Sequence, residues 1–358
     1  MDTTFLNIYN YKNQDLVIEK YLLWTHIIPF LTLPIYIEGA YCLFTCNYKF
    51  QQNYVSVLTF HVTLSLIGEC YGFFLMRPVV ILPIVGLYSD GLLAFFQIHT
   101  FLQVIIFFFL FQINACTMIH LLLLRFKTIV PFTYRYYTRV TQLGTLFVFG
   151  TYLGSVVSLA NFALLYEDQD HAKTFWFQVL NGVVPDNFGS NNYIVTSGEY
   201  RRFDMFLKLC GCSLVLYTCS CIIIPLVAFK ILNKVKERLS TKVVRGHEQY
   251  LKSVLIQVSI IVSFLLVPFA TFIIGLKMRI HSPLLVAVSI TLAISHGAAS
   301  TLAMIFANKP YRAILLSHFE LFWQLIRCSS NCREQKTSKV SSTNVPNTVL
   351  KCWKTSWS

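Results

Sequence analysis

Long apolar runs separated by short polar segments make up most of this chain. A membrane-spanning helix needs about 20 apolar residues. Seven stretches meet this requirement: 21–45, 54–76, 91–124, 141–166, 204–230, 250–276 and 282–307. The pattern therefore predicts an all-α membrane protein, a seven-transmembrane helix bundle. The third run is longer than a bilayer requires, which predicts that its helix tilts or extends beyond the membrane.

The segments outside these spans have their own patterns. In 308–332, apolar residues recur every three or four positions, which predicts an amphipathic helix on the membrane surface. Cys328 and Cys332 are candidates for lipidation, with ordinary reduced thiols as the alternative. The polar, Ser/Thr-rich segment 333–358 is expected to be a disordered tail. The polar segment 1–20 does not have the pattern of a signal peptide.

The distribution of positive charge predicts the orientation of the spans. Of the 29 Lys and Arg residues, 20 lie in four segments on one side: 46–53, 125–139, 230–252 and 308–358. The segments on the opposite side hold 8: 1–20, 77–90, 167–204 and 277–281. Because Lys and Arg are enriched in cytoplasmic loops, the first side is expected to be cytoplasmic and the N-terminus extracellular.

Composition argues against a soluble enzyme. The chain is 55% hydrophobic and only 13% charged, about half the usual share of ~25% in soluble domains. The sequence has no His-Glu-x-x-His zinc motif and no phosphate-binding loop. Its nine histidines are scattered without a paired ligand spacing. We therefore expect no enzymatic activity, no cofactor and no metal site, and membrane lipids in place of nucleic acid as a partner.

Polar residues inside the predicted spans are candidates for a binding site, because polar groups are costly in lipid. Thr100, Gln103 and Phe107 share one face of the third span, Gln97 precedes them, and Glu69 lies in the outer half of the second span. Aromatic side chains with a few polar groups suit a small-molecule pocket. The alternative is that these residues only pack helices together.

A second group of candidates lies on the predicted cytoplasmic side. The basic residues there include Arg125, Lys234, Lys236, Arg238 and Arg245. They could attract an acidic protein partner, but orientation of the spans and attraction to anionic lipid explain the same charges. Pro268 interrupts the sixth span and predicts a kink there, a candidate helix hinge.

One set of residues carries a resemblance to a known family. His296 and Gly297 in the last span, followed by Pro310, Tyr311 and Arg312 after it, resemble the end of nematode serpentine chemoreceptors. Within these, the chain is most similar to class I (Sri) and class H (Srh) of the Str superfamily. The likeness extends from Tyr21 to Arg312.

The resemblance implies a G-protein-coupled receptor for olfaction or a related chemical sense. Its partners would be a small environmental chemical, odorant-like or pheromone-like, and a cytoplasmic heterotrimeric G protein. Its place would be the plasma membrane, in a sensory cilium. The residues by themselves leave open a ligand-gated channel, a transporter or a structural membrane subunit. A transporter is expected to show inverted repeats and matched broken helices, which the sequence does not display.

Orientation can be tested directly with epitope tags. A tag at the N-terminus should be labelled on intact cells, and a tag placed after Lys336 should be labelled only after permeabilisation, because the excess of Lys and Arg keeps its side in the cytoplasm. Immunofluorescence before and after permeabilisation measures both. The reverse pattern would contradict the receptor interpretation and favour a channel.

Overall fold

The structure is a computed structural model of the whole chain. It describes residues 11–45, 52–81, 86–129, 137–164, 167–179, 182, 184, 188–196, 200–238, 240–277 and 282–338. The chain divides into two units, Met1–Tyr311 and Arg312–Ser358, and each is considered by itself.

Six helices in the described ranges are long and apolar enough to cross a membrane. They lie within α1 (Tyr11–Thr45), α2 (Gln52–Cys70) with the π-helical turn η2 (Tyr71–Met76), α4 (Thr100–Ile129), α5 (Tyr137–Ala163), α7 (Tyr200–Val235) and α10 (Pro283–Ala307). A shorter apolar stretch, Leu255–Thr271, falls where the sequence predicts the sixth span. It belongs to three helical pieces that follow one another without a break: α8 (Thr241–Ile261), the π-helical turn η4 (Val262–Leu266) and α9 (Val267–Lys277). The short 3₁₀ turn η3 (Lys236–Arg238) comes between α7 and α8.

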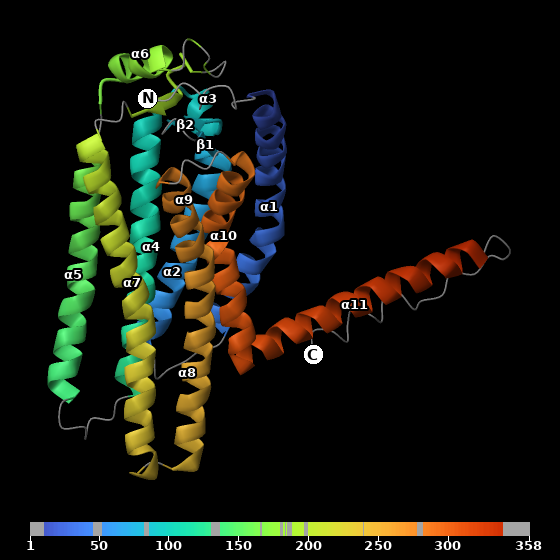
Figure 1. Cartoon of the computed structure of the whole chain (residues 1–358). Coiled ribbons are helices and arrows are strands. Elements are labelled where there is room, and N and C mark those ends of the chain that lie inside the picture. The colour runs from blue at the N-terminus through green and yellow to red at the C-terminus, as the bar shows by residue number, and fades with distance from the viewer. Residues whose placement is uncertain are drawn as a thin grey trace. The chain divides into compact units, whose positions relative to one another are not determined.

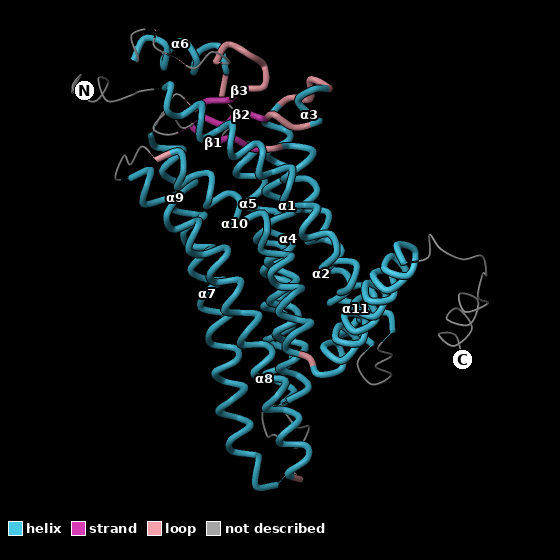
Figure 2. Tube along the Cα trace, turned by 90° about the vertical axis from the view of Figure 1, so that its right-hand side faces the viewer, coloured by secondary structure: helices cyan, strands magenta, loops and turns pink. Residues whose placement is uncertain are grey.

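The long helices pack side by side in one bundle (Figures 1 and 2). Helix α10 packs against α1, α2 and α8, and helix α4 packs against α2, α5 and α7. Many large apolar side chains remain exposed on the outside of the bundle, Phe30, Phe44 and Leu146 among them. A soluble protein would bury such residues, so this surface suits contact with lipid chains.

The predicted third span, 91–124, is not one helix. A short helix, α3 (Leu92–Phe95), is separated from α4 by a turn in which Gln97 has a φ of 56°. A left-handed residue cannot continue a right-handed helix, so the helix is interrupted here and α4 begins at Thr100. Hydrophobicity does not register the break, because α3 is itself apolar. At its other end α4 continues to Ile129, five residues beyond the prediction.

A small antiparallel sheet, which the sequence analysis did not predict, covers one end of the bundle. Its strands β1 (Pro78–Ile81), β2 (Gly86–Ser89) and β3 (Tyr193–Val195) lie in that order. Together with α6 (Gln169–Val179), the sheet forms what we call the lid (Figures 1 and 2). The Gln169 side-chain amide accepts from the backbone N–H of Val195 at 2.9 Å and donates to its carbonyl at 3.2 Å. This side chain therefore bonds the edge of β3 as a neighbouring strand would.

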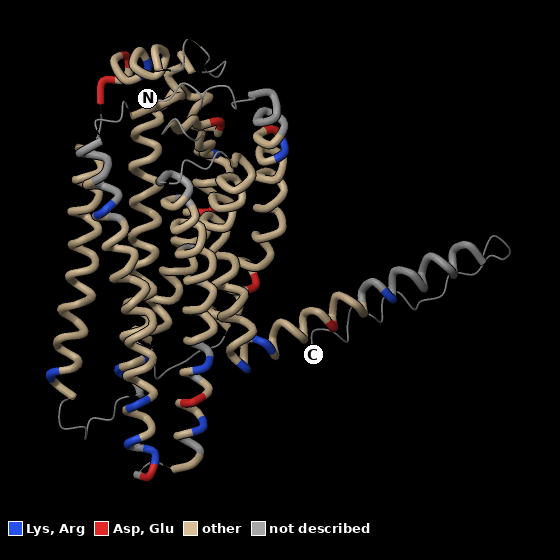
Figure 3. The backbone as a smooth tube through the Cα atoms, viewed as in Figure 1, with Lys and Arg blue, Asp and Glu red and all other residues tan. Residues whose placement is uncertain are grey.

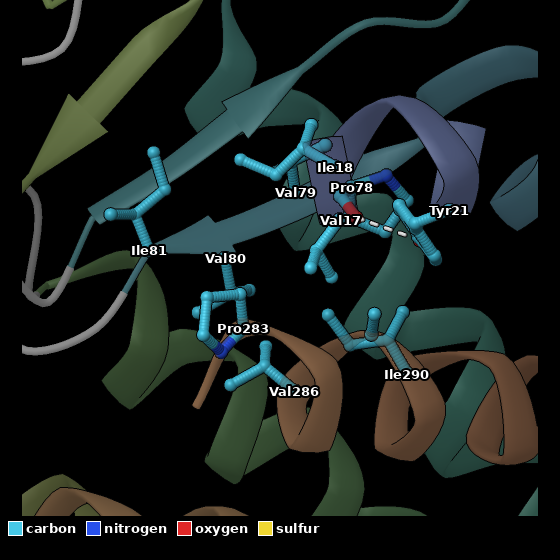
Figure 4. A pocket seen from close by; sticks show the side chains of 11 residues that line it. Val17, Ile18, Tyr21, Pro78, Val79, Val80, Ile81, Pro283, Val286 and Ile290 are labelled. Carbon is cyan, nitrogen blue, oxygen red and sulfur yellow. Dashed lines mark hydrogen bonds between the residues drawn. The ribbon is translucent and has the colours of Figure 1, made fainter. Parts of the chain in front are cut away.

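The lid is seated between α1 and α10. Val79 and Val80 of β1 line a narrow crevice together with Ile18 of α1 and Ile290 of α10 (Figure 4). The Tyr21 hydroxyl donates to the Pro78 carbonyl at 2.9 Å. The crevice has a volume of only about 20 Å³, room for about one water molecule. It is therefore a packing contact that fixes the lid and has no room for a ligand.

Helix α11 (Lys309–Ser338) covers the predicted amphipathic segment 308–332 and extends past it. Leu316, Phe319 and Phe322 on this helix are exposed. Its location on a membrane surface stays a prediction. The side chains of Cys328 and Cys332 lie outside the described residues, as do residues 1–10 of the predicted N-terminal segment and 339–358 of the predicted tail. Residues 11–20 are helical and begin α1.

Two glycines allow the helices around α10 to approach closely. A Cβ added at Gly297 would lie 2.5 Å from the Ser65 Cβ and 2.6 Å from the Tyr36 hydroxyl oxygen. A Cβ added at Gly39 would lie 2.5 Å from a Thr301 methyl carbon. Neither position has room for a side chain. The absence of a Cβ at both glycines therefore lets α1, α2 and α10 pack closely.

This close approach predicts how glycine substitutions differ. Gly297→Ala should lower the thermal unfolding midpoint of the purified protein, because overpacking a tight contact costs ~1–3 kcal/mol. Gly154→Ala on α5 is the matched control, since nothing lies within 4 Å of its added Cβ. The control should unfold at or above the wild-type midpoint. Equal midpoints for the two variants would contradict the packing account.

Candidate functional site

A cavity of about 110 Å³ lies within the bundle between α4, α5, α7, η4, α9 and α10. Helix α4 lines most of it, with side chains that recur at the spacing of one helical face: Phe108, Phe111, Gln112, Ala115 and Ile119. Phe269 of α9 and Leu266 of η4 also line it. The walls are therefore mainly aromatic and aliphatic, as in sites for small molecules. We call it the α4–α7 cavity.

Asn114 and His296 bring a polar network to this cavity. The Nδ1 of His296 lies 2.7 Å from the Ala293 carbonyl oxygen, and a carbonyl can only accept, so Nδ1 carries the proton. His296 Nε2 is then an acceptor, and Asn114 Nδ2 donates to it at 3.0 Å. The same amide nitrogen donates to Ser65 Oγ of α2 at 2.9 Å. The imidazole is thus neutral, and its hydrogen-bonding capacity is used within the protein.

Gln112 is bonded at only one end of its amide. Its Nε2 donates to Ser158 Oγ of α5 at 2.9 Å, while its Oε1 is buried and has no partner among the residues described. On the opposite wall the Tyr217 hydroxyl lies 3.2 Å from Ser155 Oγ. The Thr218 hydroxyl donates to the Leu214 carbonyl of its own helix at 2.8 Å. Among the described residues that line the cavity, the Gln112 oxygen is therefore the buried polar atom that lacks a hydrogen-bond partner.

The sequence matches a known family. The family model for the serpentine type 7TM GPCR chemoreceptor Srh matches residues 18–321. The chain belongs to the Srh family of serpentine chemoreceptors. Of the two classes that the sequence resembles, the match supports class H and leaves class I unsupported. No curated protein matches the chain. The Srh protein is thus a seven-transmembrane protein of a receptor family, and not an enzyme.

Thr100 and Gln103 of this Srh protein lie beneath the lid and hold it. The Thr100 hydroxyl donates to the Asn192 carbonyl at 2.9 Å, and the backbone N–H of Ser89 donates to the same carbonyl at 3.1 Å. The Ser89 hydroxyl lies 2.6 Å from Gln103 Oε1. Gln103 Nε2 donates to the Ile98 carbonyl at 2.7 Å, which also stabilises the turn before α4. We call Ser89, Thr100, Gln103 and Asn192 the lid latch.

The other residues predicted to bind a ligand are dispersed. Gln97 is exposed in the turn before α4, and Phe107 packs in an apolar cluster with Tyr71 and Val104. Glu69 is buried and accepts hydrogen bonds from two residues of α1, Thr32 and Tyr36. None of the five predicted residues lines the α4–α7 cavity. A direct effect of these side chains on ligand potency stays a prediction.

The aromatic residues of α6 contribute unequally to the lid. Only Trp176 of the sequence Phe175-Trp176-Phe177 packs against the lid core, and its indole N–H donates to the Thr196 carbonyl at 2.7 Å. Phe177 is 52% exposed, and Phe175 is 36% exposed.

An ion pair also stabilises the lid. The Asp90 carboxylate lies 3.3 Å from the Arg77 guanidinium and accepts a hydrogen bond from the Tyr88 hydroxyl at 2.8 Å. Burial raises the pKa of Tyr88, and the hydrogen bond to Asp90 adds to the increase.

Arg125 lies buried at the other end of α4. Its Nη2 donates to the Tyr54 hydroxyl of α2 at 2.5 Å, and its guanidinium carbon lies 4.0 Å from the centre of the same ring. Such stacking of a guanidinium on an aromatic ring stabilises both side chains. The sequence identified Arg125 but not its partner, which is 71 residues away along the chain.

Basic side chains gather at this end of the bundle, where α7 and α8 meet (Figure 3). We call it the basic end. Lys234, Lys236 and Arg245 are exposed there. Arg238 belongs to η3, but its side chain lies outside the described residues.

The sequence analysis overlooked the two amides of α4 that shape the cavity. Gln112 and Asn114 interrupt a strongly apolar run, and each is a polar group in a predicted span. These two positions could therefore have been recognised from the sequence, as Thr100 and Gln103 were on the outer part of the same span.

The lid latch predicts that Gln103 controls lid stability. Gln103→Leu would leave the Ile98 carbonyl without the amide that donates to it, which costs ~1–3 kcal/mol. It would also remove the contact between Gln103 and Ser89, whose hydroxyl keeps the Met76 carbonyl as a partner. Amide hydrogen exchange in residues 188–196 should then accelerate by about tenfold or more at constant global stability. Leu102→Ala is the control, because Leu102 is 50% exposed on the same helix turn. Unchanged exchange in Gln103→Leu would show that the latch does not hold the lid.

Proposed function

We propose that this protein is a G-protein-coupled chemosensory receptor that binds a small chemical in the α4–α7 cavity. The observation that carries the proposal is the cavity itself, a mainly apolar space with a few polar groups inside a membrane bundle. Membership of the Srh family supports a receptor role in general terms. The ligand site, the signalling partner and the orientation are our proposals.

We propose that the lid faces outward and the basic end faces the cytoplasm. The charge asymmetry supports this orientation, because exposed Lys and Arg concentrate around α7 and α8. The protein would then lie in the plasma membrane with its N-terminus outside. A ligand would reach the cavity from the lid end or through the bilayer.

Ligand binding would act on the basic end through the helix formed by α8, η4 and α9. Val262 and Leu266 of the π-helical turn line the cavity, and Pro268 follows two residues later. A π-helical turn and a proline both weaken the regular hydrogen-bond ladder. We therefore keep Pro268 as the proposed hinge and place the flexible region at 262–268. A molecule in the cavity contacts this region directly.

The basic end is closed in this structure. Phe126 of α4, Leu232 of α7 and Leu251 of α8 pack in one buried cluster there, and Arg125 is only 4% exposed. A partner that binds between these helices would need α8 to move away from α4 and α7, a known type of switching motion. The exposed basic side chains would attract an acidic surface of a G-protein α subunit and speed its encounter.

The test compares two basic residues at the same end of α4. Arg125→Ala should abolish receptor-dependent nucleotide exchange on a G-protein α subunit in cell membranes, because the guanidinium is needed when the basic end opens. Lys127→Ala removes the same charge from a side chain that bonds only Thr145 in the described contacts, at 3.0 Å. The control should retain most of the exchange activity. Both variants are compared at equal surface expression.

Two results would contradict the proposal. Equal loss of exchange in both variants would mean that positive charge alone matters, as attraction to lipid would require. If nucleotide exchange is equally fast in membranes with and without the wild-type protein, the protein does not couple to the G-protein α subunit.

A further inference from the structure

We propose that the ligand of the α4–α7 cavity is a small uncharged hydroxyl compound, whose hydroxyl group bonds the Gln112 amide. This inference rests on the proposed function for its biological meaning, but the binding it describes can be measured without signalling. It follows from the charge, size and unfilled hydrogen bond of the cavity.

The charge of the lining excludes an ionic ligand. Within the described part of the chain, no Asp, Glu, Lys or Arg lines the cavity. His296 cannot compensate a negative charge, because its neutral imidazole is bonded to Ala293 and Asn114. Moving an unpaired carboxylate or ammonium into such an environment is very costly. The ligand must therefore be neutral when bound.

The volume of the cavity suits a ligand, or the part of a ligand that enters it, of a few atoms. An apolar cavity of about 150 Å³ can bind benzene. By proportion, the cavity of about 110 Å³ has room for roughly four to five non-hydrogen atoms. Phe108, Phe111 and Phe269 would contact the hydrocarbon part of such a molecule.

The unfilled hydrogen bond identifies the functional group. Leaving a buried amide oxygen without a donor costs about as much as losing a hydrogen bond. A ligand hydroxyl would donate to Gln112 Oε1. If the amide is turned so that its oxygen faces Ser158, the free group becomes an N–H, to which the same hydroxyl oxygen can bond. A hydroxyl satisfies Gln112 in both orientations, whereas an ether or a ketone can only accept.

Three other polar side chains of the cavity already have partners within the protein. Asn114 is committed to Ser65 and His296, and Thr218 to its own helix. Tyr217 lies within hydrogen-bond distance of Ser155. Ser158 accepts from Gln112, and Ser213 also lines the cavity. Gln112 carries the buried oxygen that has no partner among the described residues, so it is the group that we expect to favour a hydroxyl.

The experiment measures binding to the full-length protein in lipid nanodiscs through the thermal unfolding midpoint. The probes are 1-butanol, its isomer methyl propyl ether, propanoate and butylammonium. Ligands that bind the folded state raise the midpoint with concentration. Ala115→Leu, which would fill the cavity, provides the reference for effects of the probes on the bilayer. We expect 1-butanol to bind wild type roughly tenfold more tightly than the ether, and the two ions to have no cavity-dependent effect.

Substitution of Gln112 tests the assigned hydrogen bond. Gln112→Leu should bind 1-butanol and the ether with equal affinity, because only the hydroxyl loses a partner. Phe109→Leu, at a partly exposed position on the same helix, should preserve the preference for the alcohol. The midpoints without probe show whether each variant is folded. Should Gln112→Leu not fold, the wild-type comparison of alcohol with ether decides the question without it.

The outcomes separate this inference from the proposed function. Equal binding of alcohol and ether to wild type, cavity-dependent binding of either ion, or no cavity-dependent binding of 1-butanol would overturn the ligand class. Cavity-dependent binding of 1-butanol without any nucleotide exchange would support the ligand class and contradict the receptor proposal. Exchange driven by propanoate or butylammonium would support the receptor proposal and contradict the ligand class.

Discussion

Polar side chains inside a membrane are stable only when they find partners within the protein, and helix α4 meets this constraint at most of its polar positions. Thr100 and Gln103 bond the lid, Gln112 bonds α5, Asn114 bonds α2 and α10, and Arg125 bonds α2. Each bond fixes the position of a neighbouring element relative to α4. The bundle is therefore organised around α4, whose polar side chains bond different neighbouring elements at different positions along the helix.

The cavity forms where this set of bonds is incomplete. At the level of Gln112, α4 is bonded to α5 only, and the amide oxygen remains unfilled beside large aromatic side chains. The neighbouring helix carries a π-helical turn at the same cavity wall. A space that lacks one hydrogen bond and adjoins an irregular helix is where a bound molecule can change the bundle most, because it supplies a missing partner and contacts a weak part of the backbone.

The sequence predicts the membrane class, the helical bundle and the family, because each depends on local hydrophobicity or on short motifs such as His296-Gly297. It did not predict contacts between distant segments. Thr100 looked like a pocket residue because its face is visible in the sequence, whereas its partner Asn192 is 92 residues away. The break at Gln97 was hidden by apolar residues on both sides. The strands were missed because each has only three or four residues.

The Gln169 side chain has a consequence for neighbouring copies of the protein. An exposed strand edge is a template on which another chain can add a strand, and natural proteins block such edges. The Gln169 amide occupies the N–H and the carbonyl of Val195, the last residue of β3. A receptor held at high density in a membrane surface would otherwise present this edge to identical molecules beside it. The Gln169 side chain thus occupies, at Val195, the place where a strand from another copy could otherwise pair.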